Sequence, residues 1–391
     1  MATERGTTRG LLHPGGWGQT GRSAPPDAGR PGGLPPPSRP GEGGRPTGLD
    51  SLAAGREDLV PAELRDLLQE LVGGPGGALP VAADRLSPRV YRLHFRGGGR
   101  VASLVVKRLD PCAARRNQLV AECWLPAVGL GENGPPLLGV AAERDGQHVW
   151  HAYEDLGDRV LDERVSDPGP VAAAVELIAR VHARFVERAV LAECRLWGTD
   201  LGASFYGRSM RDAIRSLQVL RQTPTALPPE RAALCDHLLR QLYRLLDEEP
   251  SRARGLEEHG GPETLLHGDP WPKNALVFPA GRGLHVRLID WDRAGVGPVG
   301  YDLSTFLGRL AAPLRPRALE LYRQAAGRLG WRLPLAAELN RLFETAELAR
   351  LANCVIWPAL AAAEGQPAWA FDQLADLEQW LQKVEPVLPA R

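Results

Sequence analysis

The chain has 391 residues and a formal net charge of zero, because 47 Lys and Arg balance 47 Asp and Glu. This length allows two or three packed units with a sizeable core. The balanced charge argues against a dedicated nucleic-acid-binding surface and against attachment to anionic lipid. The five cysteines include no C-x-x-C pair, which argues against a disulfide framework and a thiolate zinc site. No apolar run is long enough to cross a membrane and no secretion signal is evident, so we expect a soluble cytoplasmic protein with neither a nucleic-acid nor a membrane partner.

The first 55 residues are predicted to be a disordered Gly/Pro-rich tail. Residues 1–50 contain 13 Gly and 9 Pro, and the few apolar side chains among them cannot offset the entropy cost of ordering the backbone. A helix is expected directly afterwards, because five leucines between residues 59 and 71 recur at helical spacing before a Gly-Gly-Pro-Gly-Gly breaker.

Strands dominate the following segment, up to residue 156. Apolar and β-branched runs at 90–95 and 101–109 are joined by a glycine-rich turn, and runs at 137–142 and 148–153 are joined through an Asp-Gly turn. Between these two predicted hairpins, residues 113–128 have helical spacing, and Pro126 should end or bend that helix. The expected order is therefore strand, strand, helix, strand, strand.

From residue 157 onward the chain is predicted to be mainly helical. Helical spacing recurs over 172–187, 214–220, 234–246, 319–329, 335–351 and 371–384. The exception is a predicted hairpin formed by residues 275–278 and 284–289. A small antiparallel sheet followed by a larger helical part indicates the α+β fold class.

A polar loop leads directly into this late hairpin and carries the strongest signal for chemistry. It contains His267-Gly268-Asp269, with Asn274 five residues after the aspartate, and the hairpin ends at Asp290. Two prolines and a glycine fix the loop backbone, which suits side chains that must be aimed at a ligand. The hairpin should return Asp290 to the loop, so that two carboxylates and an amide oxygen share one small volume. Hard oxygen ligands of this kind suit Mg²⁺ together with substrate phosphates and water.

The ordered set of motifs resembles the protein-kinase-like fold of the aminoglycoside phosphotransferase and choline kinase superfamily. His-Gly-Asp-x-x-x-x-Asn, then Ile-Asp-Trp-Asp at 289–292, then Gly-Tyr-Asp-Leu at 300–303 is the usual succession in that family. The resemblance implies two lobes: a nucleotide-binding lobe over 56–156 and a catalytic and acceptor-binding lobe over 157–391. It implies that Asp269 is the catalytic base or positions the acceptor hydroxyl, while Asn274 and Asp290 hold Mg²⁺ on the nucleotide phosphates. Asp302 is expected to cap a helix or to accept hydrogen bonds from the catalytic loop, and His182 is expected to be a core residue.

The first lobe supplies the candidates for nucleotide binding. Lys107 lies at the end of an apolar strand, where we expect a lysine to pair with an acidic side chain. Glu122 of the following helix could provide that carboxylate. By the resemblance, this Lys–Glu pair places the lysine on the α- and β-phosphates. Residues 153–157 resemble the linker between the lobes, where backbone groups, with Glu154 and Leu156 as candidates, would hydrogen-bond adenine.

Two departures from the protein-kinase pattern matter. The segment over 82–90, which should cover the phosphates, contains no glycine, so Ser87 and nearby backbone amides are the candidates for phosphate contact. No Ala-Pro-Glu-type segment follows Asp290, which speaks against a protein substrate.

We therefore expect an ATP- or GTP-dependent, Mg²⁺-dependent kinase that phosphorylates a hydroxyl of a small molecule. The competing hypothesis is a kinase-like nucleotide-binding regulator that has lost turnover, which the glycine-free phosphate segment favours. The C-terminal helices supply acidic and aromatic side chains that would suit a cationic amine or a sugar as acceptor: Glu344, Glu347, Glu364, Asp372, Asp376, Trp357, Trp369 and Phe371. Amphipathic helices with charged outer faces would give the same pattern, so aminoglycoside, choline-like, amino-alcohol and sugar acceptors all stay open.

Overall fold

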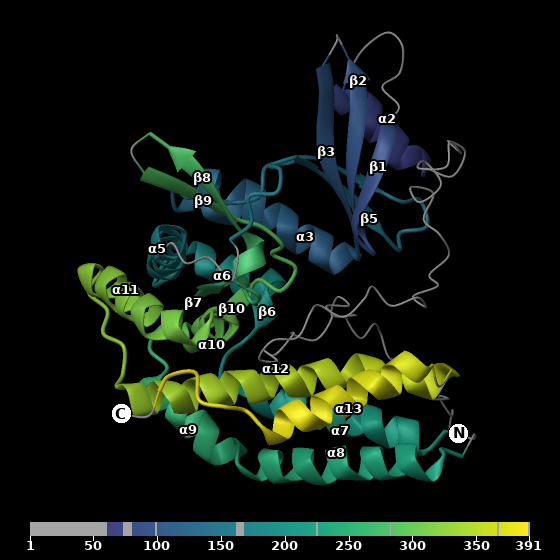
Figure 1. Ribbon diagram of the computed structural model, residues 1–391, viewed down its shortest axis with the longest axis vertical. Helices are drawn as coiled ribbons and strands as arrows, with labels where there is room; N and C mark the ends of the chain where they lie inside the picture. Colours follow the sequence, from purple (N-terminus) through teal and green to yellow (C-terminus); the bar gives the residue numbers. More distant parts are fainter. Residues whose placement is uncertain are drawn as a thin grey trace, which may run out of the picture.

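A computed structural model describes residues 61–72, 80–97, 100–161, 168–223, 226–281, 283–365 and 367–389. The predicted tail over residues 1–55 lies outside these ranges. Figure 1 shows a sheet with one covering helix at the top, small sheets and helices in the middle, and a layer of long helices at the bottom. The α+β class and the two-lobed arrangement are confirmed, with the antiparallel sheet first and the mainly helical part after it.

The first lobe is built on a five-stranded antiparallel sheet in the order β1-β2-β3-β5-β4. Its strands are β1 (Pro80–Ser87), β2 (Val90–Gly97), β3 (Arg100–Leu109), β4 (Leu137–Ala142) and β5 (Val149–Glu154). Alternation along β2 places Tyr91, Leu93 and Phe95 on one face of the sheet. Helix α2 (Ala62–Val72) covers this face, and its Leu64 and Leu68 share one buried cluster with the three side chains.

Both predicted hairpins of this lobe are confirmed, and β1 is a further strand that the sequence does not reveal. β1 pairs antiparallel with β2 at the edge of the sheet. Its residues 84–87 are exposed, so it lacks the alternation of apolar and polar side chains that identifies a half-buried strand. The turn between β1 and β2 falls within the segment expected to cover the nucleotide phosphates.

The helix between the hairpins changes its winding part-way. Helix α3 (Pro111–Leu119) begins with Asp110 as N-cap, whose Oδ1 accepts the N–H of Ala113 (2.9 Å). One turn of π-helix (Val120–Trp124) and the short α4 (Leu125–Ala127) follow, so the helix ends close to Pro126 as predicted. A π-turn rotates the residues after it relative to a regular α-helix, which matters for the side chain of Glu122.

The second lobe has two cores. The first packs α5 (Pro168–Phe185), α6 (Val190–Trp197), α10 (Gly300–Arg309) and α11 (Arg315–Arg328) around two small sheets. These sheets are β6 (Thr199–Asp200), β10 (Gly295–Pro298) and β7 (Glu263–Leu266) in that order, and the hairpin of β8 (Ala275–Ala280) with β9 (Gly283–Leu288). The second core lies in the bottom layer of Figure 1, where α7 (Ser204–Arg221) and α8 (Pro229–Asp247) pack with α12 (Ala336–Gly365) and α13 (Ala368–Gln382).

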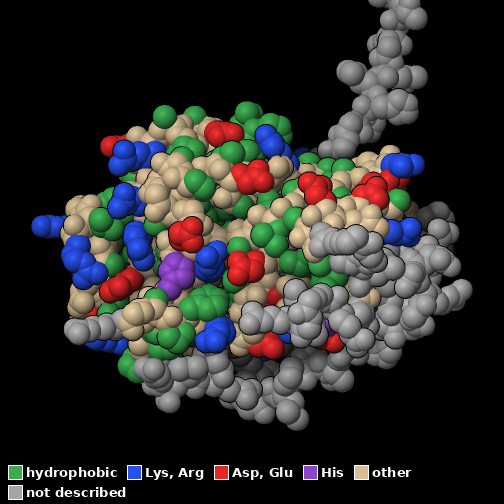
Figure 2. Space-filling view, turned by 90° about the horizontal axis from the view of Figure 1, so that it is seen from above, with side chains coloured by type: hydrophobic (Ala, Val, Ile, Leu, Met, Phe, Trp, Pro, Cys, Tyr) green, Lys and Arg blue, Asp and Glu red, His purple; other side chains and the backbone are tan. Residues whose placement is uncertain are grey.

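The predicted hairpin and the six predicted helices of this lobe are all found, but α6, α9 (Glu249–His259) and the strands β6, β7 and β10 are not predicted. These strands have two to four residues, too few for a period-two pattern to be recognised. Among the described residues, no helix has both the length and the apolar character needed to cross a bilayer. On the face shown in Figure 2, positive and negative side chains are mixed with each other and with apolar ones.

Candidate active site

The loop between β7 and β8 is anchored by one buried carboxylate. Asp302, in the first turn of α10, is 1 % exposed, and its two oxygens accept the backbone N–H groups of His267 (2.7 Å) and Gly268 (2.9 Å). Nε2 of His182 lies 3.2 Å from the same carboxylate, and its Nδ1 lies 2.8 Å from the hydroxyl of Tyr322. The expected structural roles of Asp302 and His182 are confirmed, because both are buried and hold the loop from behind.

Gly268 allows this loop to pack against the chain that follows β9. Its φ is +80°, and a Cβ at this position would lie 2.0 Å from the carbonyl oxygen of Arg293. Residues with a side chain rarely adopt this conformation and would collide with that backbone. The glycine therefore brings Asp269 next to the Ile-Asp-Trp-Asp segment.

His267 supports the loop with both ring nitrogens. Its Nδ1 accepts the backbone N–H of Asp269 (3.3 Å), and its Nε2–H donates to the carbonyl of Ile289 (2.9 Å). The ring centroid lies 4.4 Å from that of Trp291. Burial lowers the pKa of His267, against the pull of nearby carboxylates, so the ring stays neutral and links the loop to the end of β9.

Asn274 ties the far end of the loop to its beginning. Its side-chain Nδ2 donates to the backbone carbonyl of Asp269 (2.9 Å), and its backbone carbonyl accepts the N–H of Ile289 (2.9 Å). This arrangement brings Asn274, Asp269 and Asp290 together, as the sequence pattern predicts. The carboxylate of Asp269 is partly exposed and has no hydrogen-bond partner in the part of the chain that the structure describes, which leaves it available to a ligand.

Lys107 of β3 reaches across from the first lobe to the end of β9. Its Nζ donates to Oδ1 of Asp290 (2.5 Å) and to Oδ1 of Asp292 (2.7 Å). Asp290 has a φ of +66°, a conformation that non-glycine residues rarely adopt and that is often found at functional sites. Asp292 also accepts from Nδ2 of Asn117 on α3 (2.8 Å). The two aspartates of the Ile-Asp-Trp-Asp segment thus share one ammonium group.

These contacts shift the pKa values of all three groups. Burial would lower the pKa of Lys107, but Asp290 and Asp292 outweigh it and raise that pKa. Partial burial would raise the pKa of Asp290, but Lys107 outweighs it and lowers the value to about 2. The pKa of Asp292 is raised, because burial and the charge of Asp290 together exceed the effect of Lys107. At neutral pH we assign Lys107 and Asp290 as an ion pair, with Asp292 beside it.

The expected Lys107–Glu122 pair is not formed, and this prediction is wrong. Glu122 is exposed and its Oε2 accepts from Nε2 of Gln118 (3.0 Å). The π-turn of residues 120–124 carries its side chain to the solvent side of the helix. The residue of this helix that reaches the site is Asn117, which is 1 % exposed and also donates to the carbonyl of Ala113 (2.9 Å).

The remaining candidates lie at the junction of the lobes. Val90, directly after the β1–β2 turn, pairs with Lys107 across the sheet, so Ser87 lies at the same end of the sheet as Lys107. Oγ of Ser87 accepts the N–H of Arg89 (3.5 Å). Glu154 ends β5 and its backbone N–H donates to the carbonyl of Pro136 (3.0 Å). The backbone groups of Leu156 have no hydrogen-bond partner among the described residues.

The comparisons with known proteins identify the chain. The family model described as the phosphotransferase enzyme family matches residues 79–339, which include most of both lobes and all the residues named above as catalytic, nucleotide-binding or metal-binding candidates. The chain belongs to this phosphotransferase family. A search of curated protein sequences gives no significant match.

Solved structures confirm the fold of this phosphotransferase family member. A spectinomycin phosphotransferase, solved with ADP and spectinomycin, superposes with a TM-score of 0.56 at 12 % identity, covering 83 % of this chain and 98 % of that one. An ethanolamine kinase from Plasmodium vivax superposes with a TM-score of 0.57 at 11 % identity, covering 81 % and 85 %. At these identities, the two similarities show that the fold is shared.

Several residues around the site of this phosphotransferase family member are not predicted from the sequence. Nothing in the sequence around Asn117 indicates a functional role, because a single asparagine within a helix is common at positions without function. Arg293, Arg309 and Arg350 gather near the catalytic loop, although 16 and 41 residues respectively separate successive members. The only sequence signal for Arg293 is its position directly after the Ile-Asp-Trp-Asp motif.

Proposed function

We propose that the protein transfers the γ-phosphoryl group of ATP or GTP to a hydroxyl group of a small molecule. The observation that carries this proposal is the convergence of Lys107 from β3 with Asp290 after β9, beside the loop that presents Asp269 and Asn274. Phosphoryl transfer depends mainly on positioning and on neutralising phosphate charge. A cation from one lobe and carboxylates from the other, held at a junction, suit both requirements.

The nucleotide would lie between the lobes. The backbone N–H and C=O of Leu156 have no partner among the described residues and would hydrogen-bond adenine, as the backbone of such linkers does in the family. The turn at Ser87 would cover the phosphates through backbone amides, and the phosphates would compete with Asp290 for the ammonium of Lys107. ADP in the spectinomycin phosphotransferase structure supports nucleotide binding by this fold.

The residues that would hold Mg²⁺ are Asn274 and Asp290. They fit this ion, since Nδ2 of Asn274 is engaged by the carbonyl of Asp269, which leaves its amide oxygen as a hard ligand, and Asp290 is an ionised carboxylate with 43 % of its side chain exposed. When bound, the ion would neutralise charge on the nucleotide phosphates.

Asp269 would accept a hydrogen bond from the acceptor hydroxyl and orient it for in-line attack. The loop that carries it is fixed on both sides, by Asp302 through two backbone N–H groups and by His267 through its ring. Rigid support of this kind is what positioning catalysis needs, because a misplacement of about 1 Å can cost about 100-fold in rate.

The competing hypothesis, a nucleotide-binding regulator without turnover, is favoured by the missing Lys107–Glu122 pair. The two functions are separated by measuring ADP release from MgATP with a panel of alcohols that includes spectinomycin, ethanolamine, glycerol and glycerate. Acceptor-dependent ADP release that is lost in D269N, while MgATP binding is kept, supports the phosphotransferase. A wild-type protein that binds MgATP and releases no ADP, with or without any alcohol, favours the regulator.

A further inference from the structure

Two cations flank the indole of Trp271, two residues after Asp269. Nζ of Lys273 lies 4.3 Å from the ring centroid, and the guanidinium carbon of Arg309 lies 5.0 Å from it. Cations within about 6 Å of an indole face are attracted by its quadrupole. Both charges are therefore fixed at the catalytic loop, one from the loop itself and one from α10.

Arg309 and Arg350 are both buried and share the carboxylate of Glu347. Oε1 of Glu347 lies 3.1 Å from Nη1 of Arg309, and Arg350 on the same helix as Glu347 pairs with its other oxygen. The arginine side chains are 6 % and 4 % exposed. Burial and then the charge of Arg350 lower the pKa of Arg309. One carboxylate thus neutralises only one of two buried positive charges, and buried charges are costly unless they are paired.

Arg293 adds a further positive charge near the catalytic loop. Its backbone packs against Gly268, and its charge interacts with the carboxylate of Asp269 and with Arg350. In the described ranges of the chain its guanidinium has neither a hydrogen-bond nor an ion-pair partner, and the residue is partly exposed. A free guanidinium offers five N–H donors in a planar fork that matches a carboxylate or a phosphate.

Trp271, two residues after Asp269 on the catalytic loop, carries a second donor without a partner in the described part of the chain. The residue is 9 % exposed and its Nε1–H is buried without an acceptor among the described residues. A buried polar group without a partner costs about 1–3 kcal/mol, which a ligand acceptor could relieve. Arg293 after β9 and Trp271 on the loop therefore each offer a donor group that has no partner among the described residues. The charge of Arg293 interacts with Asp269, and Trp271 is two residues from it.

We propose that the phosphoryl acceptor carries an anionic group, a carboxylate or a phosphate, which Arg293 binds beside Asp269 with the indole N–H of Trp271 as a further donor. This inference rests on the proposed phosphotransferase function. It replaces the expectation of a cationic amine, for which the C-terminal helices supply less acidity than the sequence suggests. Glu347 is neutralised by Arg309 and Arg350, and Glu344 lies 3.4 Å from Arg252.

The test uses the full-length protein saturated with Mg²⁺ and the non-hydrolysable analogue AMPPCP, so that the nucleotide site is filled. Calorimetric titrations with inorganic phosphate, acetate and tetramethylammonium then probe the acceptor side. We expect the anions to bind the wild type and R293Q to weaken that binding at least tenfold, since loss of one charge-assisted contact of about 1.4 kcal/mol corresponds to tenfold. Stronger binding of acetate points to a carboxylate on the acceptor, and stronger binding of phosphate points to a phosphate ester.

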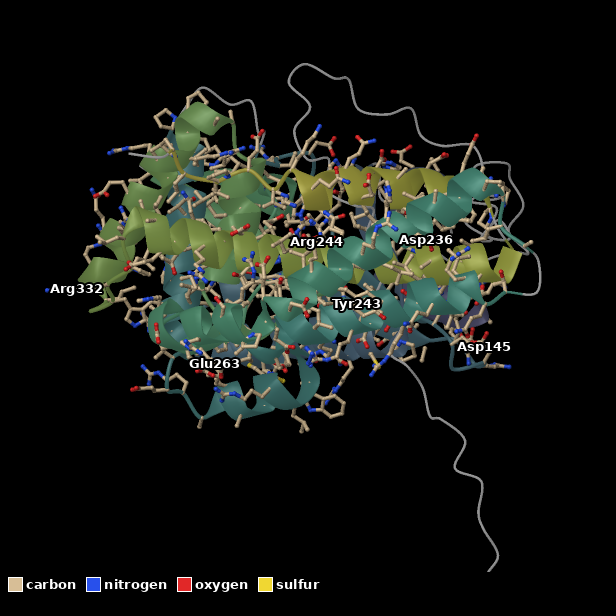
Figure 3. The ribbon with its side chains drawn as sticks, turned by 90° about the horizontal axis from the view of Figure 1, so that it is seen from below. Asp145, Asp236, Tyr243, Arg244, Glu263 and Arg332 are labelled. Carbon is tan, nitrogen blue, oxygen red and sulfur yellow. The ribbon has the colours of Figure 1, made fainter. Side chains whose placement is uncertain are left out.

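Two variants make the result interpretable. R293K keeps the positive charge and should retain most of the anion affinity. R332Q removes an exposed arginine at the outer edge of the molecule, labelled in Figure 3, and should behave as the wild type. Equal anion binding by the wild type and R293Q, no anion binding by the wild type, or preferential binding of tetramethylammonium would overturn the inference alone. Failure of MgAMPPCP itself to bind would overturn the proposed function, and the inference with it.

Discussion

Nζ of Lys107 lies 2.5 Å from Oδ1 of Asp290, although 183 residues separate the two in the chain. Lys107 is held within β3 by pairing with Val90 on one side and His151 on the other. Asp290 directly follows the strand β9 in the second lobe. The contact therefore joins a rigid sheet of one lobe to the catalytic loop region of the other, at the position where we place the nucleotide phosphates.

Replacing Lys107 with methionine should lower phosphotransfer by about 100- to 1000-fold, the usual effect of removing one group that stabilises developing phosphate charge. The variant also leaves Asp290 and Asp292 together without their shared cation, which should cost about 1–3 kcal/mol of stability. Denaturant unfolding and steady-state kinetics measure the two effects.

The double variant K107M/D292N separates these effects. It removes the repulsion, so it should recover part of the lost stability and none of the lost activity. K383M, at an exposed lysine, serves as the control. Activity restored by the double variant would contradict a role for Lys107 on the phosphates.

Changing Asp269 to asparagine should lower turnover by about 100- to 10,000-fold, because the amide cannot accept the proton of the acceptor hydroxyl. Affinity for MgATP should stay nearly unchanged, since we place this residue on the acceptor side. Turnover is followed by ADP release, and MgATP affinity by calorimetry. D66N, at an exposed aspartate of α2, is the matched control, and a similar loss in both variants would refute the assignment.

Asp302 should contribute to stability as well as to activity. Alanine at this position leaves the buried N–H groups of His267 and Gly268 without acceptors, which should destabilise the protein by about 2–4 kcal/mol. The loop would also lose its support, so turnover should fall. D247N, at an exposed aspartate of α8, should change stability by less than about 0.5 kcal/mol. Denaturant midpoints would speak against this account if D302A matched that control.

Glu347 should give the protein an acid-sensitive component of stability. Burial works to raise its pKa, but Arg350 and Arg309 outweigh burial and lower the value from 4.5 to about 2. Because the folded-state pKa lies below the unfolded one, this stabilisation is fully present above about pH 4.5 and is lost as the pH falls toward 2. At about 1.4 kcal/mol per pKa unit, the loss over this window is about 3 kcal/mol.

Urea unfolding of wild type and E347Q between pH 2 and pH 7 measures this component. The difference in unfolding free energy between the two proteins should be largest near neutral pH and should shrink below pH 4.5. E364Q, at an exposed glutamate of the same helix, should show no such convergence. A constant difference across the pH range would argue against the pairing of Glu347 with the two arginines.

The catalytic loop could be predicted because its information is local. His267, Asp269 and Asn274 lie within eight consecutive positions, and proline and glycine at fixed places restrict how the loop can run. The return of Asp290 follows from the hairpin pattern alone. The two lobes follow from the change of periodicity near residue 157, since strand and helix patterns differ in period.

The contacts of Lys107 could not be predicted from the same information. Glu122 has the charge expected of a partner, but which side of a helix faces a sheet depends on winding, and a π-turn changes it. The acidic character of α12 was likewise misleading. Arg350 is three residues from Glu347 and visible in the sequence, whereas Arg309 is 38 residues away and its contact depends on how α10 packs on α12.

The most direct test of a magnesium-nucleotide site at Lys107 and Asp290 is a thermal-shift titration of the purified protein with ATP and with GTP, in the presence and absence of Mg²⁺, beside D290A. A ligand that binds the native state raises the melting temperature. We predict a shift with at least one nucleotide that requires Mg²⁺ and is lost in D290A. No shift with either nucleotide at millimolar concentration, or a shift of equal size in D290A, would contradict the site proposed for the phosphates.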